Sequence, residues 1–154
     1  MLEGRKGAKF KFFWKGSEDG TGGVGLLVAE RWIKNVIDVQ RVNERLLVVR
    51  VAVGGSVLNL ICVYAPQVGR SLEEKEEFLV LVGKMISSVN VKERLVVAGD
   101  FNCHVGADAL GYEGVHGGHG FGQRNVEGEM LLELASALGL VVEPPGGHMF
   151  HETG

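Results

Sequence analysis

Four short apolar segments follow one another closely between residues 23 and 63, and they restrict the fold more than any other feature of the chain. They are rich in Val, Ile and Leu, which favour strands, and they cover residues 23–28, 36–42, 46–53 and 56–63. Gly54-Gly55 joins the last two segments and suits a type I′ hairpin turn. The spacing predicts an antiparallel meander over residues 23–63. The segment KFKFFW at residues 9–14 has the composition of a further strand.

The hydrophobic period then changes from that of strands to that of helices. Ser71 and Glu74 form a capping box, and apolar residues at helical spacing predict a helix over residues 72–89. Leu95–Ala98 is expected to be a short buried strand. A second helix is predicted over 126–138, between an Asn125 N-cap and a Gly139 C-cap, and a strand is expected to start at 140–142. This order of strands and helices indicates an α/β or α+β layered fold.

Composition excludes several classes of protein. The chain has 154 residues, 45% of them apolar, with a net charge of −3, which indicates one globular domain with a hydrophobic core. Two Cys exclude a disulfide scaffold. The near-neutral net charge excludes a basic arm as the source of affinity for nucleic acid. No apolar run reaches the roughly 18 residues of a membrane span. The N-terminus lacks the apolar core of a signal peptide, so we expect an intracellular protein, nuclear or cytoplasmic.

Two motifs that suggest a cofactor or a metal site are weak evidence for either. Residues 20–25 match GxGxxG, but a strand follows where a dinucleotide site needs a helix. The pairs His116/His119 and His148/His151, with Cys103 nearby, suggest zinc, yet no CxxC occurs and both pairs lie in irregular, Gly-rich sequence. No aromatic-rich stripe indicates binding of single-stranded nucleic acid.

Polar residues follow two of the expected strands. Tyr64 lies in Val63-Tyr64-Ala65-Pro66, and Gly99-Asp100-Phe101-Asn102 follows the strand at 95–98. In an extended chain Asp100 and Asn102 would point to the same side. A carboxylate can bind a hard cation or take a proton from water, and an amide can hold that water or donate to an anionic oxygen. An Asx turn after the strand is the alternative reading of the same pair.

Together these two motifs resemble the endonuclease/exonuclease/phosphatase superfamily, whose members are related to DNase I. The narrower resemblance is to craniofacial development protein 2-like sequences, a retrotransposon-derived endonuclease branch. The resemblance covers most of the chain up to about Val142, and the residues that carry it most clearly are GGV at 22–24, VYAPQVG at 63–69, GDFNCHVG at 99–106 and GYEGVHGG at 111–118.

The resemblance implies a DNase I-like four-layer sandwich, in which helices flank two packed β-sheets. It also implies a phosphodiesterase of endonuclease type that depends on Mg²⁺ (or Mn²⁺) and acts on DNA. Asp100 would bind the metal and orient or deprotonate the attacking water. Asn102 would hold that water or the phosphate, and the Tyr64 hydroxyl would donate to a phosphate oxygen. Metal and donors would stabilise the charge that grows in the transition state.

The same resemblance implies two further features that this sequence lacks: a metal-binding Glu on a strand before the GGV segment, and a terminal Asp-His pair. The sequence is therefore expected to be a copy truncated at both ends, with little or no activity. Its organisation is expected to be a poorly defined segment 1–22, a partial domain 23–142 and a divergent tail 143–154 containing two prolines. The main alternative is a non-catalytic remnant or pseudoenzyme that serves as a binding module. A zinc module built on Cys103, His116 and His119 is a third hypothesis.

Overall fold

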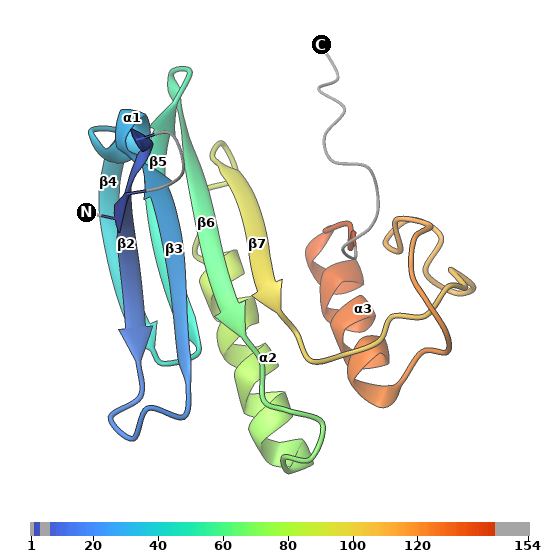
Figure 1. Cartoon of the computed structure of the whole chain (residues 1–154). Helices are drawn as coiled ribbons and strands as arrows, with labels where there is room; N and C mark the ends of the chain where they lie inside the picture. The colour runs from blue at the N-terminus through green and yellow to red at the C-terminus, as the bar shows by residue number, and fades with distance from the viewer. Residues whose placement is uncertain (1, 4–6, 144–154) are drawn as a thin grey trace. The chain divides into compact units, whose positions relative to one another are not determined.

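The structure is a computed structural model that describes residues 2–3 and 7–143. Figure 1 labels its elements. The strands of the described residues are β1 (Leu2–Glu3), β2 (Lys9–Gly16), β3 (Gly23–Ala29), β4 (Val36–Asn43), β5 (Leu46–Val53), β6 (Ser56–Tyr64) and β7 (Arg94–Asp100). The helices are α1 (Glu30–Ile33), α2 (Leu72–Ser87) and α3 (Val126–Leu138). This mixture of strands and helices confirms the expected α+β class.

Two units divide the described residues. The first takes the chain up to residue 66 and residues 84–101, and it holds every strand named above. The second takes residues 67–83 and the chain from residue 102, and it holds α3 and most of α2. The described part of the chain has no helix with the length and apolar character needed to cross a membrane. Most of the tail expected at 143–154 lies outside the described residues.

The larger sheet of the first unit has the strand order β4-β5-β6-β7. Strands β4, β5 and β6 are antiparallel neighbours, and β7 lies parallel to β6. The hairpin between β5 and β6 turns at Gly54 and Gly55, whose φ angles of 57° and 81° are those that a type I′ turn needs. The meander and its Gly-Gly turn are thus confirmed for residues 36–63.

The smaller sheet corrects the prediction for residues 23–28. Strand β3 pairs with β2, from Phe10 opposite Ala29 to Gly16 opposite Gly23, so the sheet order is β1-β2-β3. The short helix α1 follows β3 directly and separates it from β4. Hydrophobic spacing could not show this, because a strand has the same pattern whichever sheet it joins. The KFKFFW segment is a strand, as its composition suggested.

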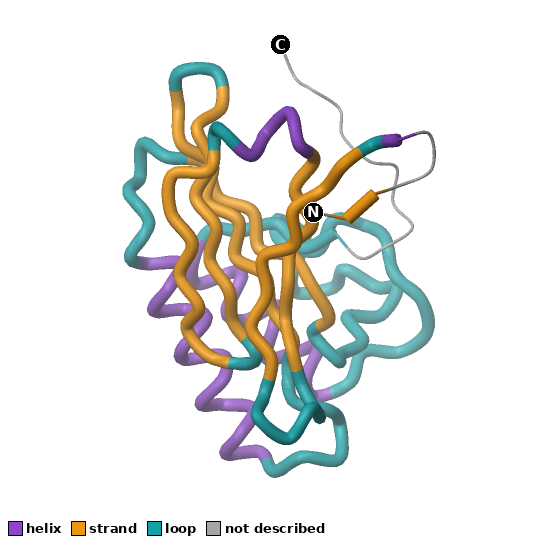
Figure 2. The backbone as a smooth tube through the Cα atoms, turned by 60° about the vertical axis from the view of Figure 1, so that its left-hand side comes forward, coloured by secondary structure: helices purple, strands orange, loops and turns teal. Residues whose placement is uncertain are grey.

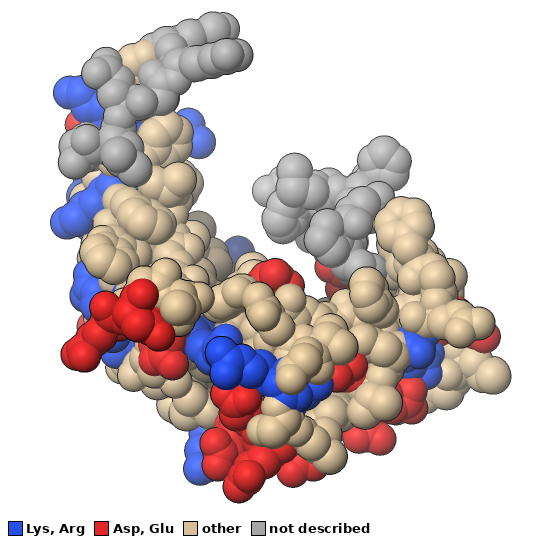
Figure 3. Space-filling view, turned by 60° about the horizontal axis from the view of Figure 1, so that its bottom comes forward, with Lys and Arg blue, Asp and Glu red and all other residues tan. Residues whose placement is uncertain are grey.

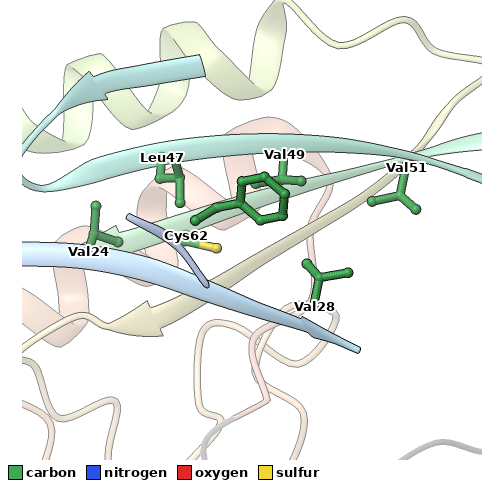
Figure 4. Close-up of a cluster of buried hydrophobic side chains, with 7 residues drawn as sticks. Val24, Val28, Leu47, Val49, Val51 and Cys62 are labelled. Carbon is green, nitrogen blue, oxygen red and sulfur yellow. The ribbon is translucent and has the colours of Figure 1, made fainter. Parts of the chain in front are cut away.

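The hydrophobic core of the first unit lies between its two sheets, which Figure 2 shows as layers of orange strands. Side chains from β2 and β3 meet side chains from β5 and β6 in one cluster (Figure 4). Its buried members are Phe13, Val24, Val28, Leu47, Val49, Val51 and Cys62. Leu47 and Val49 are completely buried, with 0% of their surface exposed. The two sheets therefore form a packed sandwich.

Strand β7 is less buried than its sequence suggested. None of its seven residues is buried, and Val96 is 43% exposed. Among the described strands β7 pairs only with β6, so it is an edge strand of the larger sheet. The expectation of a buried strand at Leu95–Ala98 was wrong. An apolar run in the sequence does not show how much of the strand's surface is covered by neighbouring elements.

Both long helices begin as predicted. The Ser71 hydroxyl accepts a hydrogen bond from the Glu74 backbone N–H at 3.2 Å, one half of the predicted capping box. The Asn125 side chain accepts from the Gly128 N–H at 2.9 Å, and Gly139 ends α3 in the left-handed conformation with a φ of 66°. Both caps of α3 are thereby confirmed.

The strand expected from residue 140 is reduced to a single bridge. Val142 forms an isolated parallel bridge with His116, and no longer strand is present there within residues 7–143. Gly117 donates to the Val142 carbonyl at 2.9 Å, and Val142 donates to the Val115 carbonyl at 2.7 Å. These two hydrogen bonds join the loop before α3 to the segment that follows α3, without a longer ladder.

Arg50, Asn59 and Glu93 form a polar cluster. It links β5 and β6 to the segment before β7. Arg50 donates to one carboxylate oxygen of Glu93 at 2.9 Å, and the buried Asn59 amide donates to the other at 2.8 Å. The hydrogen bond from Asn59, followed by the charge of Arg50, holds the pKa of Glu93 below its ordinary value of 4.5. The folded state therefore favours the ionised form of this carboxyl group.

This cluster predicts a pH-dependent loss of stability in Glu93→Gln. Because the pKa is lowered on folding, the stabilisation is complete above the ordinary pKa of 4.5 and is lost as the pH falls through the folded value. The variant should melt at a lower temperature than the parent at pH 7, and the gap should close in strongly acidic buffer. Thermal melts followed by circular dichroism measure both. Glu76→Gln, at an exposed position of α2, is the control and should match the parent. Equal melting temperatures of Glu93→Gln and the parent at pH 7 would contradict the prediction.

Candidate functional site

Parallel pairing of β6 and β7 places Tyr64 beside Asp100. The register runs from Leu58 opposite Arg94 to Tyr64 opposite Asp100, and the Ala65 N–H continues it by donating to the Asp100 carbonyl at 2.8 Å. Register partners on neighbouring strands point to the same face of a sheet. The two sequence-predicted residues of the first unit therefore share one face, at the carboxyl ends of two parallel strands.

The face they share is the one that packs on the smaller sheet. Tyr64 is half-buried and packs against the core cluster, two residues after its buried member Cys62. Asp100 is exposed. The pair thus lies where the sandwich ends: the phenol ring rests on the core, and the carboxylate is open to water.

Arg45 is a third residue at this end of the sheet, and the sequence analysis missed it. The Tyr64 N–H donates to the Arg45 carbonyl at 2.9 Å. The Arg45 guanidinium lies 5.7 Å from the centre of the Tyr64 ring and donates to the Tyr64 carbonyl at 3.4 Å. A positive charge beside a phenol is suited to an anionic ligand. In the sequence, Arg45 is a single Arg between two predicted strands. The side chain of such an Arg is most often solvated.

The turn before β5 fixes the position of Arg45. The Asn43 side-chain oxygen accepts from the Arg45 N–H at 2.9 Å, which is an Asx turn. The start of β3 passes near this turn, since a Cβ placed on Gly22 would lie 3.8 Å from Cγ of Glu44. Glu44 therefore brings a second carboxylate to the same end of the first unit.

Asn102 does not continue the extended chain. Strand β7 ends at Asp100, and Asn102 has a φ of 47°, in the left-handed region that Asn tolerates better than most residues. Asn102 is also the first residue of the second unit. The chain is therefore not extended through Asn102, contrary to the assumption under which both side chains would point to one side.

The histidine and cysteine residues do not assemble a zinc site in the described residues. No group of three or more His, Cys, Asp or Glu side chains there could hold a metal ion. His116 is buried, its Nε2 lies 2.9 Å from the Gly106 carbonyl, and its Nδ1 accepts from the Gly118 N–H at 3.1 Å. Both ring nitrogens thus hold a loop together. His148 and His151 lie outside the described residues.

Cys62 is not suited to act as a nucleophile. Burial raises the pKa of its thiol, which favours the unreactive protonated form. Its side chain is instead part of the core cluster.

A scan of the chain against models of known protein families found no match, and a search of curated proteins found none either.

Gly99 is required for the pairing that sets this geometry, and its substitution gives a testable prediction. Its φ is 149°, and a Cβ at this position would overlap the Val63 carbonyl oxygen in the neighbouring strand. Gly99→Ala should lower the free energy of unfolding by roughly 1–3 kcal/mol or more, from backbone strain and from separation of the strands. Chemical denaturation measures the loss, and the amide NMR shifts of Tyr64 and Asp100 should move.

Gly69→Ala is the matched control for this substitution. No atom lies within 4 Å of a Cβ placed on Gly69, and its φ lies outside the positive range that strains other residues. The control should stay within about 0.5 kcal/mol of the parent, as is usual for surface substitutions. If Gly99→Ala were as stable as Gly69→Ala, the close approach of β7 to β6 would be incorrect.

Proposed function

We propose that this chain carries the phosphate-binding part of a Mg²⁺-dependent phosphodiesterase of endonuclease type, with DNA as its substrate class. The observation that carries the proposal is the row formed by Arg45, in the turn before β5, Tyr64 at the end of β6 and Asp100 at the end of β7. The resemblance of the surrounding motifs to DNase I-related enzymes supports it, and the DNase I-like four-layer sandwich is part of the same proposal.

Each residue of the row has a distinct chemical role in the proposal. The Tyr64 hydroxyl donates to a phosphate oxygen, and the Arg45 guanidinium balances the charge of the phosphate. The Asp100 carboxylate orients the attacking water or takes its proton, and it is the oxygen ligand for the metal. The resemblance adds Asn102 as a residue that holds the water or the phosphate.

The residues present fit Mg²⁺ only as a weak site. Mg²⁺ is often bound by one or two carboxylates, with water and substrate phosphate oxygens completing its shell. In the row, Asp100 is the one carboxylate, and no cluster of three ligating side chains occurs in the part of the chain that the structure describes. When bound, the ion would neutralise the charge that develops on the phosphate. We therefore propose low metal affinity and little or no hydrolysis by this chain alone.

A non-catalytic binding module is the second candidate. The observation that favours it is that Asp100 is the one carboxylate in the row, because phosphate binding by Arg45 and Tyr64 does not require a metal. In either case we propose a reducing location, in the nucleus or the cytoplasm, because two Cys in 154 residues do not make a disulfide scaffold.

Titration with Mg²⁺ and Mn²⁺ distinguishes the two candidates. Mg²⁺ at millimolar concentration should shift the NMR signals of Asp100 and Tyr64, and Mn²⁺ should broaden them by paramagnetic relaxation. Both effects should disappear in Asp100→Asn, which removes the charge and keeps the size of the side chain. They should persist in Glu77→Gln, an exposed change on α2. The same response to metal in Asp100→Asn and in the parent, or no response in either, would leave only the binding module.

A nicking assay tests the expected lack of hydrolysis. Purified chain incubated with supercoiled DNA and Mg²⁺ should leave the plasmid intact, because one carboxylate binds the ion weakly. Nicking by the parent that vanishes in Asp100→Ala would show an active enzyme and overturn the expectation of inactivity.

A further inference from the structure

Strand β7 forms an edge of the larger sheet that carries no device against further pairing. Figure 1 shows it in yellow beside β6, its one neighbour among the described strands. The pairing with β6 runs over all seven residues without a shift of register. The strand contains no Pro and no Lys, and its only charged residues are Arg94 and Asp100, at its two ends. Because proteins usually block an open edge with bulges, lysines or prolines, β7 is suited to accept another strand.

Other edges of the two sheets are less suited to this. Strand β4, at the opposite edge of the larger sheet, is irregular, with one shift of register between Val36 and Asp38 and a second before Asn43. Such irregularities prevent regular pairing with another chain. Strand β3, at an edge of the smaller sheet, has no charged residue that could select a register. Strand β7 is thus regular and has a charge at each end.

The backbone of β7 points alternately toward β6 and away from it. The Asp100 carbonyl accepts from the Ala65 N–H at 2.8 Å, and the Arg94 carbonyl accepts from the Asn59 side chain at 3.2 Å, so both carbonyls face β6. The N–H and C=O of one residue point to the same side of a strand, and the side alternates from residue to residue. Val97 lies midway between the two charged residues, so its N–H and C=O point to the open edge.

We propose that β7 pairs antiparallel with β7 of a second copy of this chain, around a two-fold axis at Val97. The two copies of Val97 would exchange both of their backbone hydrogen bonds across this axis. In the same register, Arg94 of each copy lies opposite Asp100 of the other, because a two-fold contact repeats every pair. Backbone direction and charge therefore select the same axis independently.

The side chains of β7 are suited to this register. Arg94 and Asp100 are both exposed, and opposite charges that face each other across two strands stabilise their pairing. Arg94 forms no ion pair with a carboxylate in the part of the chain that the structure describes. Val96, which is 43% exposed, would lie opposite Ala98 of the second copy, which is also exposed in the single chain. Pairing would remove part of this apolar surface from water.

The charge of the whole chain does not oppose the association of two copies. The net charge is −3 over 154 residues. On the face drawn in Figure 3, blue basic and red acidic side chains lie next to one another in several places. A small net charge of mixed sign gives little repulsion between copies, and so it leaves the local pairing of Arg94 with Asp100 to decide the contact.

This contact does not depend on the function proposed for the row of Arg45, Tyr64 and Asp100. It would place Arg94 of the second copy beside the carboxylate of that row, where it would compete with Mg²⁺. The test measures the oligomeric state without metal. A monomeric chain would therefore contradict the dimer without affecting the metal titration, and a chain that binds no metal would leave the dimer unaffected.

Sedimentation velocity over a range of concentrations measures the association. The parent should change from monomer to dimer as its concentration rises. Arg94→Asp and Asp100→Arg should each raise the dissociation constant of the dimer by roughly tenfold or more, because each replaces two pairs of opposite charge by two pairs of like charge. Arg31→Asp makes the same change of charge at an exposed position of α1, and it should dimerise as the parent does.

A mixture of the two weakened variants tests the register. When Arg94→Asp and Asp100→Arg are combined in equal amounts, every acidic position of one variant faces a basic position of the other. The mixture should therefore dimerise about as well as the parent, although each variant alone does not. Circular dichroism confirms that both variants are folded, and Arg94→Asp with Asp100→Arg in one chain should likewise restore the dimer.

Hydrogen exchange locates the contact within β7. The Val97 amide should become more protected as the concentration rises, because its N–H is bonded only in the dimer. The Val96 amide points toward β6 and should be protected at every concentration.

Four outcomes would overturn the proposal. One is a parent that stays monomeric at its highest soluble concentration, and another is a dimer that neither charge change weakens. The third is a mixture of folded variants that remains monomeric. The fourth is growth beyond the dimer, because a two-fold contact is used up once two copies have paired.

Discussion

Parallel pairing of β6 with β7 is the constraint on which the candidate chemistry depends. Parallel neighbours need a long crossover, which α2 occupies here, so residues 64 and 100 meet although the chain runs through a helix between them. The pairing also needs Gly99, because the Val63 carbonyl leaves no space for a side chain there. One backbone requirement thus fixes the distance between a phenol and a carboxylate, and any shift of register would separate them.

The position of β7 at the edge of its sheet explains the chemical character of the site. An edge strand is covered on fewer sides, so Asp100 keeps its contact with water. Carboxylate oxygens are ligands for hard cations, but one carboxylate by itself binds such a cation weakly. Tyr64 is held more firmly, because its ring packs against the core and lies beside Arg45. Within the proposed function, this difference favours binding of a phosphate over activation of water.

Glycine permits close approaches of different kinds in this structure. At Gly99 it allows two backbones to approach, and at Gly25 it allows the Phe12 ring to lie over the sheet. In the second unit, a Cβ on Gly128 would overlap the His104 carbonyl, so glycine is also needed where α3 meets the loop before it. These glycines lie at close approaches within strands and helices, which no turn pattern in the sequence reveals.

Local patterns in the sequence determined the strands at 36–63, the Gly54-Gly55 turn, the helices and the cap residues Ser71, Asn125 and Gly139, because each depends on neighbours within a few positions. The sequence also indicated Tyr64 and Asp100 as polar residues at strand ends. Only the tertiary structure decided that β3 joins β2, that β7 is an exposed edge, that Arg45 stands beside Tyr64 and that Phe12 and Trp14 face solvent. Those outcomes depend on pairing between distant segments. The residues of a strand do not specify which strand it pairs with or which elements pack over it.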